Sequence, residues 1–198
     1  VNTLVRVDGG YKGYNTDAIG LYRELEEENI IIKDKEVIIL GAGGASNAIT
    51  YICADKGAAK IYLLNRTFDK AKKLADDVNS HFGDVVVPLA ISDYRLIPEG
   101  KYPVIQTTSC GLYPHNDDAP IYDKEFYELV EAGVDIIFNP AKTMFMKLCK
   151  ESGARSYNGL KMLLYQGIAA FELWNDIKVP KNLADKILGM MERKLKES

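Results

Sequence analysis

The chain is poor in the residues that mark secreted or metal-binding proteins. Its 198 residues include only three cysteines and two histidines, and no ligand spacing links Cys53, Cys110 or Cys149 to His81 or His115. A few widely separated cysteines are typical of reduced thiols in a cytosolic protein. We therefore expect a cytoplasmic protein with free thiols and no bound metal.

Long runs of one charge and long apolar runs are also missing. Lysine and arginine number 25 against 28 aspartates and glutamates, which gives a net charge of −3. This balance argues against binding to nucleic acid or to a membrane surface. No apolar run reaches the length of a membrane span, and no signal peptide opens the sequence. We expect a small molecule as the main partner.

Apolar residues are abundant, at 47% of the chain, which is enough to build a sizeable core. The first residue is Val1, not methionine, and it stands inside a predicted strand. A native start in the middle of a strand is unusual. We therefore expect a fragment of a longer protein.

Strands and helices alternate through most of the chain. A hairpin is predicted over 1–14, with a turn at 8–10, and a helix follows over 18–29. Short β-branched runs predict strands at 36–40, 60–65, 84–88, 102–108 and 134–138. Helical patterns lie between them at 44–56, 68–79, 123–131 and 143–150. This order, without repeats, predicts an α/β protein with a doubly wound parallel sheet. From Gly159 onward two consecutive helices are predicted instead, one apolar and one amphipathic.

A glycine turn in "LGAGGAS" follows a predicted buried strand and opens a helix. Such a turn presents free backbone N–H groups at the positive end of a helix dipole, and glycines let a pyrophosphate approach closely. Ser46 replaces the third glycine of the usual dinucleotide fingerprint. The alternative is a tight turn that binds nothing. We predict that the pyrophosphate binds at Gly41, Ala42, Gly43, Gly44 and Ala45.

The triplet Asn65-Arg66-Thr67 ends the next predicted strand. NAD-binding units carry a carboxylate there, which bonds the ribose hydroxyls and would repel a 2′-phosphate. Asn65 is uncharged, Arg66 offers a planar fork to a phosphate, and Thr67 adds a hydroxyl. Lys70, one turn later, adds a second cation. The pattern predicts NADP rather than NAD, and its alternative is a solvated Arg and Lys at a helix start.

Further motifs make the chain resemble the shikimate dehydrogenase family over essentially all 198 residues. In chain order they are "VNTLVR", "GYNTDAIG", "LGAGGAS", "NRTFDKA", "TTSCGLYP", "FNPAKT" and "NGLKMLLYQG". The glycine loop and Asn-Arg-Thr recur in glutamyl-tRNA reductases, but this chain has no charge footprint for tRNA. The resemblance implies reduction of 3-dehydroshikimate to shikimate with NADPH, in the chorismate pathway to aromatic amino acids.

The family has a substrate domain and an NADP domain with the active site in the cleft between them. The resemblance thus implies a substrate-domain remnant over 1–16, a Rossmann-like NADP domain over 17–157, and C-terminal helices over 158–198 that return to the substrate domain. It also implies that Asn2, Asp17 and Gln166 contact the substrate, with Asp17 the partner of a catalytic lysine. Ile136 and Gly159 match positions bordering the nicotinamide.

Structural interpretations of the same residues stand beside these. Asp17 is also typical of a helix N-cap, Gln166 of a hydrogen-bonded core amide, and Asn2 of a turn amide. Cys110 is better explained as a small buried residue than as a nucleophile, because no motif links either histidine to its thiol.

The sequence departs from the family at several points. Gln106 stands where the family generally has asparagine. Phe138 replaces a tyrosine whose hydroxyl contacts the substrate in many family members. The missing hydroxyl leaves open whether the protein prefers shikimate or quinate. The family's serine clamp and its Thr-x-Pro-x-Lys stretch, which bears the catalytic lysine, have no match, and Lys12 is an expected surface residue. We expect this chain to bind NADP(H) but to turn over negligibly. A quinate/shikimate dehydrogenase, a stand-alone NADP-binding regulatory module, and assembly as a homodimer stay open.

Overall fold

The computed structural model describes residues 1–197, and their contacts divide the chain into two compact units. Unit 1 holds Val1–Asn29 and the residues from Gly159 onward, and unit 2 holds Ile30–Asn158. The predicted NADP domain spans 17–157, whereas residues 17–29 belong to unit 1, because the helix Thr16–Glu27 packs along a C-terminal helix. The match between these units and functional domains stays a prediction.

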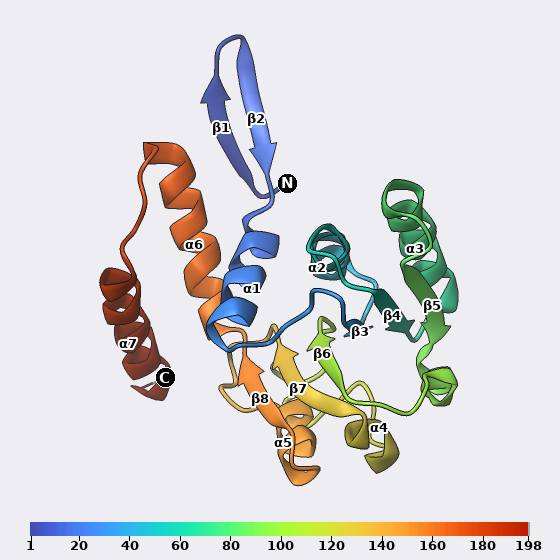
Figure 1. The fold of residues 1–198 in the computed structure, drawn as a ribbon. Coiled ribbons are helices and arrows are strands. Elements are labelled where there is room, and N and C mark those ends of the chain that lie inside the picture. Colours follow the sequence, from blue (N-terminus) through green and yellow to red (C-terminus); the bar gives the residue numbers. More distant parts are fainter. Residues whose placement is uncertain (198) are drawn as a thin grey trace. The chain divides into compact units, whose positions relative to one another are not determined.

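Unit 2 is built on a six-stranded sheet in which every neighbouring pair is parallel (Figure 1). In sheet order the strands are β5 (Val86–Ala90), β4 (Lys60–Asn65), β3 (Glu36–Leu40), β6 (Tyr102–Gln106), β7 (Val130–Asp135) and β8 (Arg155–Asn158). The chain runs from β3 outward to β5 and then returns across β3 to β6. The predicted doubly wound α/β fold is confirmed, and its switch point lies between β3 and β6.

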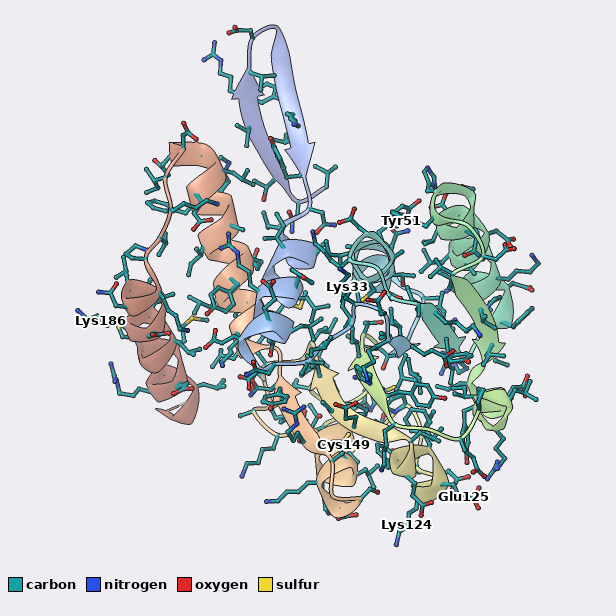
Figure 2. The ribbon with its side chains drawn as sticks, in the orientation of Figure 1. Lys33, Tyr51, Lys124, Glu125, Cys149 and Lys186 are labelled. Carbon is teal, nitrogen blue, oxygen red and sulfur yellow. The ribbon has the colours of Figure 1, made fainter. Side chains whose placement is uncertain are left out.

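The helices of unit 2 connect these strands. They are α2 (Gly44–Asp55), α3 (Phe68–Phe82), α4 (Lys124–Glu128) and α5 (Met144–Glu151), with a 3₁₀ helix, η1 (Ile91–Leu96). α2 and α3 pack together beside β3, β4 and β5, while α5 packs on β7 and β8 (Figure 1). The core includes the fully buried rings of Phe126, Tyr127 and Phe145. Cys53 and Cys149 are buried, Cys110 is half-buried, and all three thiols are free (Cys149 is labelled in Figure 2).

The largest differences from the sequence prediction are at two strands. β7 covers Val130–Asp135 rather than 134–138, because the chain turns out of the sheet after Asp135, whose carboxylate accepts the N–H of Ile137 at 3.0 Å. The first half of β7 contains Glu, Ala and Gly, which are depleted in strands, so the sequence pattern did not predict it. β8 was not predicted at all, since "RSYN" has no β-branched residue, and its pairing with β7 defines it.

Unit 1 begins with an antiparallel hairpin of β1 (Thr3–Val7) and β2 (Gly10–Tyr14), which confirms the predicted one. Its helices are α1 (Thr16–Glu27), α6 (Leu160–Asn175) and α7 (Lys181–Glu197). α1 and α6 pack along one another, and α7 packs on α6 through Leu164, Ile168 and Ala184. No helix among residues 1–197 is both long enough and apolar enough to cross a membrane.

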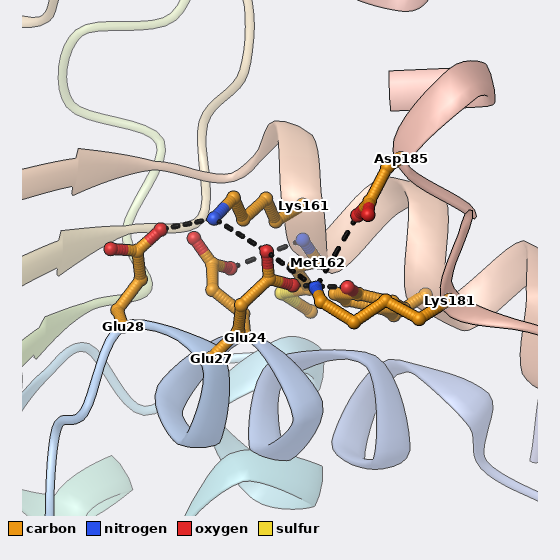
Figure 3. A network of polar contacts seen from close by, with 8 residues as sticks. Glu24, Glu27, Glu28, Lys161, Met162, Lys181 and Asp185 are labelled. Atoms are coloured by element: carbon orange, nitrogen blue, oxygen red, sulfur yellow. Dashed lines mark hydrogen bonds and ion pairs between the residues drawn. The ribbon is translucent and has the colours of Figure 1, made fainter. Parts of the chain in front are cut away.

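A buried glutamate joins α1 to the start of α6 (Figure 3). Glu24 is 1% exposed, and its Oε2 accepts the N–H of Met162 at 3.1 Å. This bond caps α6, whose N-cap residue Gly159 has no side chain to do so. Burial raises the pKa of Glu24 to about 8. Its half-buried neighbours Glu27 and Glu28 both pair with Lys161, and Glu27 also pairs with Lys181, whereas within residues 1–197 Glu24 forms no ion pair.

Gly20 sets how closely α1 approaches α6. A Cβ there would lie 2.6 Å from the Met162 carbonyl oxygen and 2.8 Å from the Gln166 nitrogen, both backbone atoms. We predict that Gly20→Ala lowers the free energy of unfolding of unit 1 by about 2–3 kcal/mol, because the helices must separate. Denaturant unfolding followed by the single tryptophan, Trp174 on α6, measures this. Gly167→Ala is the control, because a Cβ there meets nothing within 4 Å, and equal midpoints for the two variants would contradict the prediction.

Candidate functional site

The carboxyl ends of β3 and β6 meet at the switch point, directly beside the glycine turn. Thr107, after β6, donates its N–H and its hydroxyl to the carbonyl of Leu40, at 2.8 and 2.7 Å. Gly41 follows with φ +110°, and a Cβ there would lie 2.6 Å from the Thr107 hydroxyl oxygen. The turn therefore requires glycine at its first position, both for conformation and for space.

The remainder of the turn is open. Gly43 is the N-cap of α2 and makes no side-chain cap bond, so no N-cap side chain accepts from the first N–H groups of the helix. A Cβ at Gly43 or Gly44 would meet nothing within 4 Å. Ser46 is buried, and its hydroxyl donates to the Gly41 carbonyl at 2.6 Å, so a small residue closes the turn from inside. This geometry fits an anion such as a pyrophosphate.

The Asn-Arg-Thr triplet joins β4 to α3. Asn65 is the last residue of β4, and its side-chain amide donates to the Thr67 carbonyl at 2.8 Å, which holds the connection in a tight turn. Thr67 is the N-cap of α3 and makes no side-chain cap bond. Arg66, Thr67 and Lys70 are exposed, and within residues 1–197 neither cation forms an ion pair. Their charges are thus available to an anionic ligand.

A groove of about 600 Å³ runs between the glycine turn and α3. It is lined by Ala42, Gly43, Asn47, Lys70, Lys73, Leu74, Asp76 and Asp77. The groove brings Lys70 to the same cavity as the predicted pyrophosphate turn. It also adds Lys73, which was not predicted as a site residue, although its spacing of three residues from Lys70 places both on one helix face.

The segments after β6 and β7 lie next to each other. Ile136 donates its N–H to the Gln106 carbonyl at 3.1 Å, and Phe138, two residues later, is 39% exposed. Gln106 is buried, and its amide donates to the Cys110 carbonyl at 3.1 Å while its oxygen accepts the N–H of Thr108. The glutamine that departs from the family pattern thus organises the loop after β6. Gly159, the other predicted nicotinamide neighbour, is the N-cap of α6 in unit 1.

Three of the predicted substrate residues lie in unit 1, where one buried threonine joins two of them. The Asn2 side-chain oxygen accepts the N–H of Thr16 at 2.9 Å and the Thr16 hydroxyl at 3.1 Å. The same hydroxyl lies 3.4 Å from the Gln166 side-chain oxygen. Thr16 is fully buried and was not predicted as a site residue, although "NTDAIG" contains it. Asn2 and Gln166 therefore have contacts within unit 1, as the alternative interpretation of structural amides expects, and their contact with a substrate stays a prediction.

Asp17 stands in the first turn of α1 but does not cap it. The N-cap is Asn15, whose side chain accepts the N–H of Asp17 at 3.1 Å. The N-cap interpretation of Asp17 is thus wrong. Within residues 1–197 its half-buried carboxylate has no hydrogen-bond or ion-pair partner. The same part of the chain contains no cluster of three His, Cys, Asp or Glu side chains placed to hold a metal ion.

These features define a class of protein, the Rossmann-like α/β domains with a glycine turn at the switch point. A sequence model described as Shikimate / quinate 5-dehydrogenase matches residues 24–92, and one described as Shikimate 5'-dehydrogenase C-terminal domain matches residues 159–186. Shikimate dehydrogenase (NADP(+)) of Carboxydothermus hydrogenoformans is 38% identical over 190 residues, which cover 96% of this chain and 67% of that protein. The chain belongs to the shikimate dehydrogenase family.

Solved structures show the same relationship. A shikimate dehydrogenase in complex with NADP+ is 34% identical with a TM-score of 0.78, covering 93% of this chain and 64% of that one. Shikimate 5-dehydrogenase from Listeria monocytogenes, in complex with shikimate and NAD, is 27% identical with a TM-score of 0.82, covering 93% of this chain and 66% of that one. The chain spans about two thirds of the length of the curated relatives it matches.

Proposed function

We propose that the protein containing this chain is an NADP-dependent shikimate dehydrogenase, which reversibly reduces 3-dehydroshikimate to shikimate. The observation that carries the proposal is the pair of unpaired cations, Arg66 and Lys70, beside an open glycine turn. The turn suits a pyrophosphate, and the cations suit the 2′-phosphate that distinguishes NADP from NAD.

NADPH, when bound, would supply the hydride that reduces the carbonyl carbon. The residues of this chain have the tasks of binding and orientation. Gly41 to Ala45 would hold the pyrophosphate, Asn65 to Lys70 the phosphorylated adenosine, and Ile136 and Gly159 the nicotinamide half. Asn2, Gln166 and Phe138 would contact the substrate. Within residues 1–197, the Asp17 carboxylate has no hydrogen-bond or ion-pair partner. It would hold the lysine that gives the developing alkoxide its proton.

A titration tests the cofactor assignment and the expected lack of turnover together. We expect NADPH to bind the 198-residue chain at least about tenfold more tightly than NADH, because the 2′-phosphate gains charge-assisted contacts. Addition of shikimate to the NADP+ complex should produce no measurable NADPH, because the chain has no match to the lysine-bearing stretch. Equal affinities would remove the NADP assignment, and robust shikimate oxidation would contradict the second expectation.

Quinate stays an alternative substrate, because Phe138 offers a ring without the hydroxyl that many family members carry. We further propose a cytoplasmic location and a homodimer for the whole protein. The half-buried and buried free thiols of the three cysteines fit a reducing compartment. Turnover of quinate by the full-length protein tests the alternative substrate, and its mass in solution tests the homodimer.

A further inference from the structure

Asp135, the last residue of β7, is a carboxylate with no exposed surface. Three groups donate hydrogen bonds to it: the Thr143 hydroxyl at 2.6 Å, the Ile137 N–H at 3.0 Å and the Gln106 amide at 3.3 Å. No lysine, arginine or histidine among residues 1–197 forms an ion pair with it. A buried acid without a cation is costly, so these neutral donors carry its stabilisation.

The three donors belong to different segments that meet at the carboxyl edge of the sheet. The Ile137 bond closes a turn directly after β7, and this turn carries Ile136 and Phe138. Gln106 bonds the loop after β6 with the same amide group that reaches Asp135. Thr143 is the N-cap of α5, and its hydroxyl oxygen accepts the N–H of Met146 at 3.3 Å. The Asp135 carboxylate therefore connects the segment after β6, the turn after β7 and the start of α5 through hydrogen bonds.

We propose that Asp135 is a positioning residue, which holds the segments after β6 and β7 in the arrangement that receives the nicotinamide half of the cofactor. The inference rests on the proposed function, because it takes Ile136 as a nicotinamide neighbour. It assigns no role to Asp135 in the adenosine half, whose predicted contacts lie at β3, β4 and α3. A change at Asp135 should therefore weaken the intact dinucleotide but not its adenosine half.

Protonation should loosen the arrangement. Burial raises the pKa of the Asp135 carboxyl to about 6, although the Thr143, Ile137 and Gln106 bonds oppose this rise. The other titratable groups that interact with it are the Cys149 thiol on α5 and the Tyr127 phenol on α4, and burial raises the pKa of both, so they stay neutral. Protonation gives Asp135 an O–H donor and removes its negative charge, so the bonds that it accepts from its three donors weaken.

The test compares NADPH with 2′-phospho-ADP-ribose, which has the same phosphates but lacks the nicotinamide, by calorimetry between pH 5 and pH 8. In the wild type, we expect the ratio of NADPH to 2′-phospho-ADP-ribose affinity to fall about fivefold as the pH drops, which is the effect of about one hydrogen bond. The 2′-phosphate titrates near pH 6 in both ligands, so the ratio cancels this contribution. Asp135→Asn, which is neutral at every pH, should show the low ratio throughout and no pH dependence.

Glu131→Gln, which removes an exposed carboxylate from the same strand, is the matched control and should behave as the wild type. Thr143→Val should lower the ratio by a smaller factor, because it removes one donor. An Asp135→Asn protein whose affinity ratio equals that of the wild type at pH 8 would overturn the proposal. Failure of both ligands to bind the wild type would instead reject the proposed function, and the inference with it.

Discussion

Arg66→Ala should weaken NADPH binding by roughly 10- to 100-fold and leave NADH binding within about twofold. A hydrogen bond to a charged group contributes about 1.5–3 kcal/mol, and the alanine removes the fork that would bind the 2′-phosphate. NADH lacks this phosphate, so it loses nothing. Fluorescence titration of the reduced cofactors at fixed ionic strength measures both affinities.

Lys72→Ala is the matched control for Arg66→Ala, since it also removes an exposed cation near the start of α3. Lys72 pairs with Asp76 at 2.8 Å and does not line the groove. It should change NADPH affinity by less than about twofold. If Arg66→Ala weakened both cofactors equally, Arg66 would have no part in distinguishing them.

Glu24→Gln should stabilise unit 1 at alkaline pH by roughly 3–5 kcal/mol and have little effect near pH 4. Burial raises the pKa of Glu24 from 4.5 to about 8, so folding favours the protonated acid. The stabilisation from this preference is complete below about pH 4.5 and is lost as the pH rises through about 8. Glutamine stays neutral and keeps an oxygen for the Met162 N–H, so the variant should not lose stability over this range.

Urea unfolding followed by Trp174 fluorescence at several pH values measures the effect in the unit that contains both residues. Glu26→Gln controls for the loss of one negative charge, because Glu26 is exposed on the same helix. It should shift stability by less than about 0.5 kcal/mol at all pH values. Parallel pH profiles for wild type and Glu24→Gln would show that Glu24 is not the group that titrates.

The central elements of the fold follow from local sequence patterns. The runs at 36–40 and 60–65 coincide with β3 and β4, because a strand buried on both faces needs continuous β-branched and apolar residues. The helix predicted over 68–79 also begins at Phe68, as α3 does. One edge of the sheet was predicted less accurately from the sequence. β8 and the first half of β7 are defined by pairing with a neighbouring strand rather than by their own residues.

The candidate site could be predicted from the sequence where its residues are consecutive. Gly41 to Ala45 and Asn65 to Lys70 form continuous stretches, and the groove between them is built from both. Contacts between distant residues were not predictable. The bond from Glu24 to Met162 and the bonds from Gln106 and Thr143 to Asp135 join parts of the chain whose spacing follows no helical or strand period. Such polar partners become visible only when the fold brings them together.

The amide of Asn2 has a fixed chemical direction. Its oxygen already accepts from Thr3, at 3.1 Å, and from the backbone and side chain of Thr16. Only the NH₂ end remains for a visiting molecule. A small molecule that reaches this amide must therefore offer it a lone pair, so a ring substituent that can only donate would gain nothing there.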